Sequence, residues 1–438
     1  MKRVLFVTLF SVVFALAFAL VGCGSNGNGP VQLTGTGTTV QFGDGTNPDI
    51  AKFELTVSSI TLTGSGSTAN TANLLAAPVE FEFSHSAGTF EPVSLSKVPA
   101  GTYSAASITW SNPEVVVVNA GVPTKLTASP ASGTINVTLT NVTIGPNAAF
   151  LNFDLDLTKS VTISGTSATI SPTFNVTATN VAASMSGEGD DNGESDDVHG
   201  KITAIAAPKF TISTTANSTI DFTTDSSTQF KDGITQLSDL KVGDIVEVDA
   251  KTQSDGTKLA TKVEREGSQS GEEAEGLINA LDNPLTKITI VHQVDSTSTA
   301  APTTVDISVN AQTQYSVRAD KLGVTGTFDA THIGKGQRVE GDADGQASPI
   351  VARKVKLREQ ALVGVVSNAT ATSFTLTPSS TSAFAQQAGA SVTVAVTIAP
   401  GANLKVTPAN TNTVRVRGLV FVSGTTYTMT ATKVDNNQ

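Results

Sequence analysis

The feature that most constrains the fold of this chain is an alternation of apolar and polar side chains at every second residue. Phe53–Val57 and Val79–Phe83 alternate in this way, and Ser391–Ile398 alternates larger apolar residues with small ones, two of which are threonine. A period of two places the apolar side chains of a strand on one face, whereas an amphipathic helix needs a period near 3.6. Clusters of Gly, Pro, Asn and Ser separate these segments and are typical of turns. The sequence therefore predicts an all-β protein, with at most one helical turn at Gln236–Leu240.

The amino terminus is a different kind of segment. Lys2 and Arg3 precede an apolar run from Val4 to Val21, which is close to the roughly 20 residues that a membrane-spanning helix needs. The end of the run favours another interpretation, because Leu20-Val21-Gly22-Cys23 resembles the lipobox of bacterial lipoproteins. The resemblance implies a signal peptide over residues 1–22, cleavage between Gly22 and Cys23, and lipid on Cys23.

The residues after the cysteine fit this interpretation. Residues 23–30 are rich in Gly, Ser and Asn, as expected of a flexible tether. Gly24 follows the cysteine where a retained lipoprotein would carry Asp, and by resemblance to known sorting rules this favours the outer membrane if the host is Gram-negative. The chain is thus expected in the cell envelope, held to a membrane through the lipid on Cys23, since two or three acyl chains anchor stably.

Charge and cysteine content limit the possible partners and chemistry. The net charge is −11, and loss of residues 1–22 with Lys2 and Arg3 gives −11 − 2 = −13. Such a surface argues against nucleic acid, whose phosphates need Lys and Arg. Cys23 is the only cysteine, so disulfides and paired-cysteine metal sites are excluded after lipidation. We predict no cofactor and no metal centre.

Residues 31–183 are expected to form the first domain, a β-sandwich. Pro99–Ser104 is typical of a turn, and the strand predicted after it continues to Trp110. Phe150–Leu157 alternates Leu and Phe with Asn152, Asp154 and Asp156. Together with the strand pattern of Val57–Leu62, these features resemble the family called domain of unknown function 4382. The resemblance implies a periplasmic or surface β-sandwich with no known activity.

An acidic linker is predicted over residues 184–198. Six carboxylates and no apolar side chain lie within the twelve residues Ser186–Asp197, so this stretch cannot offset the entropy lost on ordering. A weak, non-specific affinity for Ca²⁺ is an alternative role. The run does not match the twelve-residue calcium loop, because Gly193 comes early and no bidentate Glu closes it.

The remainder of the chain repeats itself three times, over residues 199–267, 274–359 and 360–438. Each copy opens with a glycine and an apolar residue two positions later: Gly200 and Ile202, Gly276 and Ile278, Gly364 and Val366. Each copy closes with a four-residue figure: Ala260–Val263, Ala352–Val355 and Ala431–Val434. Gly243–Glu247 in the first copy corresponds to Gly336–Glu340 in the second, but the third copy lacks this glycine-led turn. This pattern resembles the family called domain of unknown function 5666, which implies one small OB-like β-barrel per copy.

Catalytic signatures are missing from the sequence. A nucleophilic triad needs a histidine oriented by an acid, and the four histidines are scattered through separate segments: His85, His199, His292 and His332. Gly64–Ala69 imitates a dinucleotide fingerprint without the surrounding βαβ unit. Asp154 and Asp156 lie about 6.6 Å apart on one strand face, a separation that suits a glycosidase pair but also the solvated face of a sandwich.

Three classes of function remain open. The favoured one is a non-enzymatic cell-envelope lipoprotein whose tandem β-modules act as interaction or spacer domains, with an envelope protein as partner. The second is a module that binds polysaccharide or another extracellular ligand. The scarcity of aromatic residues argues against it, since sugar binding usually needs exposed aromatic side chains and Trp110 is the only tryptophan. The third is a carboxylate-based hydrolase using Asp154 or Asp156.

Overall fold

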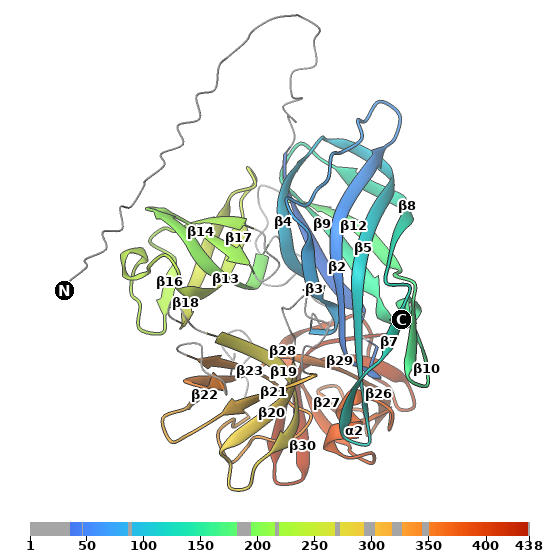
Figure 1. Cartoon of the computed structure of the whole chain (residues 1–438), viewed down its shortest axis with the longest axis vertical. Helices are drawn as coiled ribbons and strands as arrows, with labels where there is room; N and C mark the ends of the chain where they lie inside the picture. The colour runs from blue at the N-terminus through green and yellow to red at the C-terminus, as the bar shows by residue number, and fades with distance from the viewer. Residues whose placement is uncertain are drawn as a thin grey trace, which may run out of the picture. The chain divides into compact units, whose positions relative to one another are not determined.

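The computed structural model describes residues 36–45, 47–85, 90–181, 194–214, 219–267, 272–292, 303–317, 326–343 and 350–436. Gly22 and Cys23, the predicted signal peptide and tether, and most of the predicted linker lie outside these residues. Thr34–Gln438 groups as one compact unit, and within its described residues no helix has the length and apolarity that a membrane crossing requires. Figure 1 shows a structure made almost entirely of strands, which confirms the all-β prediction.

The N-terminal domain is a β-sandwich. Its strands are β1 (Thr36–Gly45), β2 (Ile50–Gly64), β3 (Val79–Glu82), β4 (Phe90–Val98), β5 (Gly101–Asn119), β6 (Val122–Lys125), β7 (Thr127–Ser129), β8 (Ser132–Ile144), β9 (Ala149–Asp156), β10 (Val161–Ser164), β11 (Ser167–Ile170) and β12 (Phe174–Asn180). Two short helical turns, η1 (Phe83–His85) and α1 (Leu157–Ser160), interrupt them. One sheet has the order β12-β9-β1-β4, a second the order β3-β2-β5-β6 with β8 on β5, and a small third one the order β10-β11-β7.

Phenylalanine side chains join the two large sheets. The ring of Phe42 on β1 packs edge-on against Phe81 on β3, with centroids 5.3 Å apart, and against Phe153 on β9 at 6.3 Å. Phe42, Phe53 and Phe153 are completely buried. The alternation read from the sequence thus places one face of each strand in a shared core, as a sandwich requires.

The Pro99–Ser104 turn is also explained by packing. A Cβ on Gly101 would lie 2.4 Å from Oγ1 of Thr68, so only glycine fits. The Tyr103 hydroxyl then donates a hydrogen bond of 2.7 Å to the carbonyl of Pro99. The turn is therefore held by the close approach of Gly101 to the Thr68 side chain and by a buried tyrosine.

Three small barrels follow the sandwich. The first contains β13 (Glu194–Ala206), β14 (Lys209–Thr214), β15 (Thr219–Thr223), β16 (Gln229–Lys231), η2 (Leu237–Asp239), β17 (Ile245–Thr252) and β18 (Lys258–Gly267). The second contains β19 (Glu272–Leu281), β20 (Lys287–His292), β21 (Thr304–Ser308), β22 (Gln314–Val317), β23 (Arg338–Ala343), β24 (Ile350–Val351) and β25 (Lys354–Leu357). The third contains β26 (Gln360–Ser367), β27 (Ser373–Pro378), α2 (Ala383–Ala388), β28 (Val394–Leu404), β29 (Thr413–Ser423) and β30 (Thr426–Asn436).

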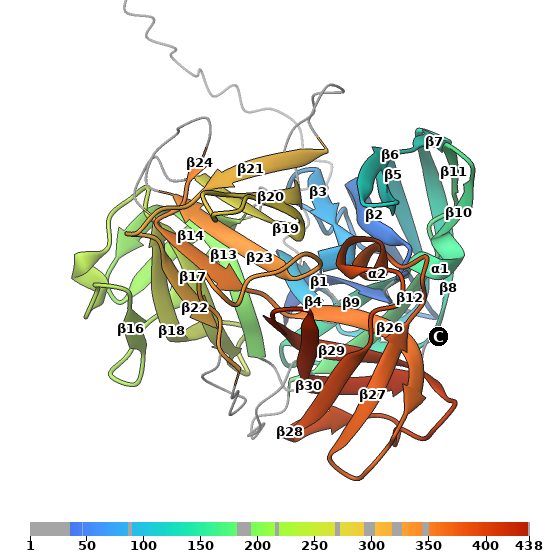
Figure 2. The same cartoon turned by 90° about the horizontal axis from the view of Figure 1, so that it is seen from below.

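The three barrels share one strand order. The third closes as β26-β27-β28-β30-β29 (Figure 2), with β28 parallel to β30 and the other neighbours antiparallel. In the first barrel the parallel pairing of β15 with β18 closes the same ring. In the second, β21 pairs in parallel with β24, which continues into β25 after two residues. This order is that of a small Greek-key barrel of the OB type.

Equivalent turns precede the fourth strand of each ring. Gly243 and Gly336 have φ of 101° and 83° and donate backbone hydrogen bonds of 2.8 Å to the carbonyls of Ile202 and Ile278. In the third barrel Thr411 has φ of 71° and donates to the carbonyl of Val366, also at 2.8 Å. The third copy, which lacks the glycine, therefore makes the equivalent turn with threonine in the left-handed conformation.

The linker prediction extends too far. Strand β13 begins at Glu194 and pairs with β17 from Glu194↔Lys251 onward, so the last residues of the range 184–198 belong to the first barrel. The physical reason is that β17 supplies backbone hydrogen-bond partners for these residues, which composition alone does not reveal. Residues 184–193 lie outside the described part of the chain.

Candidate functional site

Among the side chains that the structure describes, those that the sequence singled out for catalysis do not assemble into one site. Nδ1 of His332 contacts both Asp329 Oδ1 at 2.8 Å and Thr331 Oγ1 at 3.1 Å within one turn. Because both contacts use the same ring nitrogen, no hydroxyl–imidazole–carboxylate relay forms. His199 lies 3.4 Å from Glu247 Oε2 in the first barrel. The side chains of His85 and His292 are not among those described.

Asp154 and Asp156 have separate structural contacts. Asp156 caps α1 by accepting hydrogen bonds from the backbone N–H of Lys159 at 3.0 Å and from its Nζ at 2.6 Å. Burial raises the pKa of Asp154, although the charges of Arg415 and Lys433 in the third barrel oppose the shift. One carboxylate is therefore occupied by a helix cap, and the other faces cationic side chains.

Trp110 does not form an exposed platform. Its side chain is 2% exposed and lies under Gly133, where a Cβ would come within 3.2 Å of the indole ring. Tyr103 and Tyr427 are buried as well. Among the residues that the structure describes, the exposed large hydrophobic side chains are aliphatic. These three rings pack inside the domains and offer no exposed aromatic surface for a sugar.

A group of charged side chains on the first two barrels was not identified as a site from the sequence. Glu247 and Asp249 on β17 lie four and six residues after Gly243, and Glu340 and Asp342 on β23 lie four and six residues after Gly336. Residues at i and i+2 of a strand share a face. All four side chains are nevertheless buried, with exposures from 0% to 3%. Four buried acids at equivalent positions need partners, because burying an unpaired charge is costly.

The partners come from the last strands of the two barrels, which carry different charges at equivalent positions. Strand β18 presents Lys262, Glu264 and Glu266, and β25 with the following residue presents Lys354, Lys356 and Arg358. The second and third positions are thus acidic in the first barrel and basic in the second. This difference allows the two barrels to contact each other through ion pairs.

Lys356 is central to these contacts. Its Nζ lies 3.1 Å from Glu247 Oε2 in the first barrel and 3.5 Å from Glu340 Oε1 in its own barrel, and it also contacts Glu266. Arg358 Nη1 lies 3.3 Å from Glu340 Oε2 and 3.6 Å from Glu247 Oε2. Although burial works in the opposite direction, the charges of Lys356 and Arg358 lower the pKa of Glu340 to about 2.

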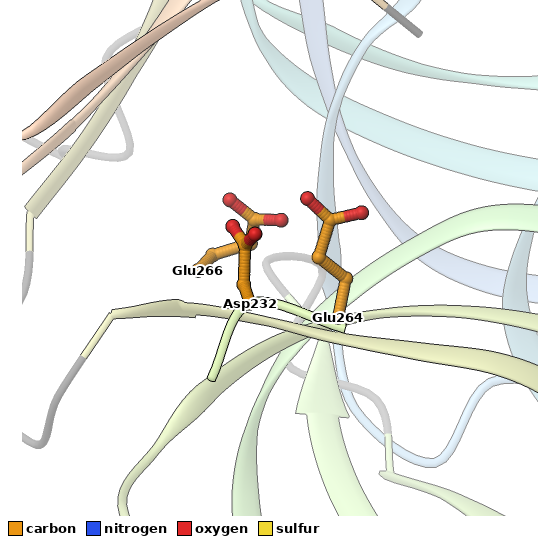
Figure 3. A group of neighbouring side chains, drawn as sticks. All are labelled: Asp232, Glu264 and Glu266. Atoms are coloured by element: carbon orange, nitrogen blue, oxygen red, sulfur yellow. The ribbon is translucent and has the colours of Figure 1, made fainter. Parts of the chain in front are cut away.

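Lys354 is directed at the first barrel. Figure 3 shows Asp232, Glu264 and Glu266 with their side chains on the same side of the chain. Lys354 Nζ lies 2.7 Å from both Asp232 Oδ2 and Glu264 Oε1. A lysine of the second barrel therefore binds between two carboxylates of the first.

Three carboxylates, here named the interface carboxylates, are less well satisfied: Glu266, Glu340 and Asp342. Each offers an oxygen within 4.8 Å of the others, and they are 1%, 0% and 3% exposed. Glu266 and Glu340 have ion pairs with Lys356 or Arg358, but no oxygen of the three accepts a well-aligned hydrogen bond from the described residues. Burial, followed by the charges of Glu340 and Glu266, raises the pKa of Asp342 well above its usual range. Burial also raises the pKa of Glu266.

The described structure is thus a β-sandwich followed by three barrels of OB-like topology, and the first two barrels share an ionic interface. Residues 199–264 match the family described as Domain of unknown function (DUF5666), which confirms the resemblance expected for the first copy. No curated protein matches the chain. A solved structure titled drosophila Unr CSD456 matches at 13% identity with a TM-score of 0.14, over 55% of this chain and 97% of that chain.

Proposed function

We propose that this chain is a non-enzymatic, lipid-anchored cell-envelope protein whose tandem β-modules act as interaction or spacer domains. The observation that carries the proposal is the arrangement of three consecutive barrels with one strand order, the first two in contact through a buried ionic interface. Repeated modules joined in this way suit a protein that presents surfaces at a distance from its anchor. The described catalytic candidates Asp156, His199 and His332, by contrast, have structural contacts.

The anchor part of the proposal depends on Cys23. The positive residues Lys2 and Arg3, the apolar run that follows them and the lipobox-like Leu20–Cys23 support lipidation there. In a Gram-negative host the expected destination is the outer membrane. The acidic surface would repel an anionic bilayer, so the lipid is expected to supply the attachment.

Membrane fractionation of the full-length chain tests the anchor. The wild type is expected in the membrane fraction with a diacylglyceryl group on Cys23, identified by mass spectrometry of the N-terminal peptide. Cys23→Ser is expected to be released from the membrane or to keep residues 1–22, because serine has no thiol to carry the lipid. Ser25→Ala in the tether is the matched control and should behave as the wild type. Normal fractionation and complete cleavage of Cys23→Ser would contradict the proposal.

Affinity capture tests the module part. The bait is the chain from Gly24 onward, which contains the whole compact unit, and the prey is a detergent extract of the host's own cell envelope. A protein partner recovered reproducibly, and lost when either the sandwich or the barrels are blocked by an antibody, supports an interaction module. Recovery of polysaccharide alone, or hydrolysis of it, would contradict the proposal.

A further inference from the structure

The first two barrels contain equivalent acids with unequal partners. In the first barrel Asp249 lies opposite Lys262 in the strand register, and Nζ of that lysine is 3.6 Å from Asp249 Oδ2. In the second barrel Asp342 lies opposite Lys354. Lys354, however, is bound between Asp232 and Glu264 of the first barrel. In the contact between the barrels, Lys354 therefore pairs with acids of the first barrel and does not neutralise Asp342.

Asp342 is left without a cation at the centre of the interface. Its side chain is 3% exposed, no cation of the described residues pairs with either of its oxygens, and its close neighbour is another carboxyl group, that of Glu266. Its carboxylate is directed at Glu266 and Glu340, within the 4.8 Å group. Lys356 contacts the latter two acids but is shared with Glu247. Three buried carboxylates therefore compete for cationic groups that already serve other acids.

We propose that Glu266, Glu340 and Asp342 bind one divalent cation of the Ca²⁺ type at the interface of the first two barrels. Three carboxylates supply up to six oxygens, which matches the six to eight oxygen ligands of Ca²⁺. The two charges of the ion add to those of Lys356 and Arg358, which these acids share with Glu247. Asp342 is the ligand that Lys356 does not pair with, so the ion takes the position where charge compensation is missing.

The donor set and its burial select the ion. The group contains no His or Cys, which Zn²⁺ prefers. Mg²⁺ dehydrates reluctantly and usually keeps several waters, and three side chains exposed by 3% or less leave little room for them. Ca²⁺ accepts flexible carboxylate geometry and is therefore the best match.

Binding at this position joins two modules. Glu266 belongs to β18 of the first barrel, and Glu340 and Asp342 belong to β23 of the second. An ion held by both strands stabilises the contact between the barrels by the free energy of binding, because the separated barrels offer an incomplete ligand set. The inference goes beyond the proposed function and does not depend on it.

Calorimetry with CaCl₂ tests the proposal on the chain from Gly24 onward, after treatment with EDTA and dialysis into about 0.15 M NaCl, where surface charges are screened. The wild type is expected to bind one Ca²⁺ per chain and to unfold at a higher temperature in CaCl₂ than in EDTA. MgCl₂ is expected to bind at least tenfold more weakly. Absence of both binding heat and a change in unfolding temperature overturns the proposal, and indicates that the carboxyl groups share protons instead.

Substitutions locate the ion. Asp342→Asn and Glu266→Gln, one in each barrel, are both expected to weaken Ca²⁺ binding at least tenfold. Asp306→Asn is the matched control, since it makes the same chemical change on the second barrel in a side chain that is 44% exposed, and it should bind as the wild type. The unfolding temperature in EDTA verifies that each variant folds. Unchanged affinity in both ligand variants overturns the proposal and places any calcium elsewhere, with the acidic run at 188–197 as the alternative.

Discussion

The buried side chain of Lys258 tests how the first barrel packs against the sandwich. It lies on β18, is 1% exposed, and its Nζ donates a hydrogen bond of 3.0 Å to Thr252 Oγ1. The same Nζ lies 5.3 Å from the centre of the Phe150 ring of the sandwich. Burial lowers the pKa of Lys258 from 10.5 to about 7. At about 1.36 kcal/mol per pKa unit, keeping this lysine charged in the folded protein costs about 5 kcal/mol.

The sign of the pH dependence follows from the lowered pKa. Between pH 7 and 10.5 the unfolded chain holds the Lys258 proton and the folded chain does not, so the free energy of unfolding rises with pH in this window. Integration from pH 7 to pH 9 gives a gain of about 2 kcal/mol. Lys258→Met removes the titrating group while keeping a flexible apolar side chain of similar length. The variant is therefore expected to be more stable than the wild type at pH 7 and to lack the gain.

Urea unfolding monitored by circular dichroism at pH 7 and pH 9 measures this difference. Lys231→Met, an exposed lysine of the same barrel, is the matched control and should show the same pH dependence as the wild type. A second measurement, NMR of ¹³C-labelled lysine, is expected to show one side chain titrating near pH 7 in the wild type and none in Lys258→Met. Identical pH profiles of the wild type and Lys258→Met would refute the reasoning, and the lysine would then be charged through a contact that compensates its burial.

Three further predictions concern the turn, the linker and a buried ion pair. Thr411→Gly is expected to raise the stability of the third barrel by about 1 kcal/mol, since left-handed φ costs a non-glycine residue about 1–2 kcal/mol; a lower unfolding temperature would show that the threonine side chain is needed. Limited proteolysis is expected to cut within residues 184–193 and to spare β13, and initial cleavage inside a barrel would contradict this. Arg338→Met should destabilise the chain by about 3–5 kcal/mol, because Glu82 and Glu275 lose a shared partner; thermal unfolding unchanged within error would show that other cations replace it.

The strands and the repeats were accessible from the sequence, because their signals are local. Alternation such as that of Phe150–Leu157 predicts β9 directly, since successive side chains of a strand point to opposite faces. The opening glycines Gly200 and Gly364 were recognised as repeat markers. Their reason appears only in the structure: a Cβ would lie 2.6 Å from the Ser213 carbonyl oxygen and 2.5 Å from the Thr377 carbonyl oxygen.

The third barrel shows where residue types mislead. Its fourth-strand turn lacks the glycine of the other two copies, yet Thr411 adopts the same left-handed conformation and makes the same hydrogen bond. The backbone pairing of β26, β29 and β30 compensates for the strain. Local propensity is a weak guide where long-range pairing decides the backbone conformation.

The ionic interface depends entirely on contacts between segments far apart in the chain. Glu247, Glu340 and Lys356 were visible in the sequence as polar positions of repeated strands, and each would be read as solvent-exposed. Their burial follows from packing one barrel against another, a contact that no pattern within about ten residues encodes. The alternation of side chains is thus enough to establish an all-β chain of repeated modules, since it reflects the geometry of single strands. Which charges are buried together, and whether they need an ion, depends on how complete modules pack, since burial and electrostatic compensation are properties of the assembled surface.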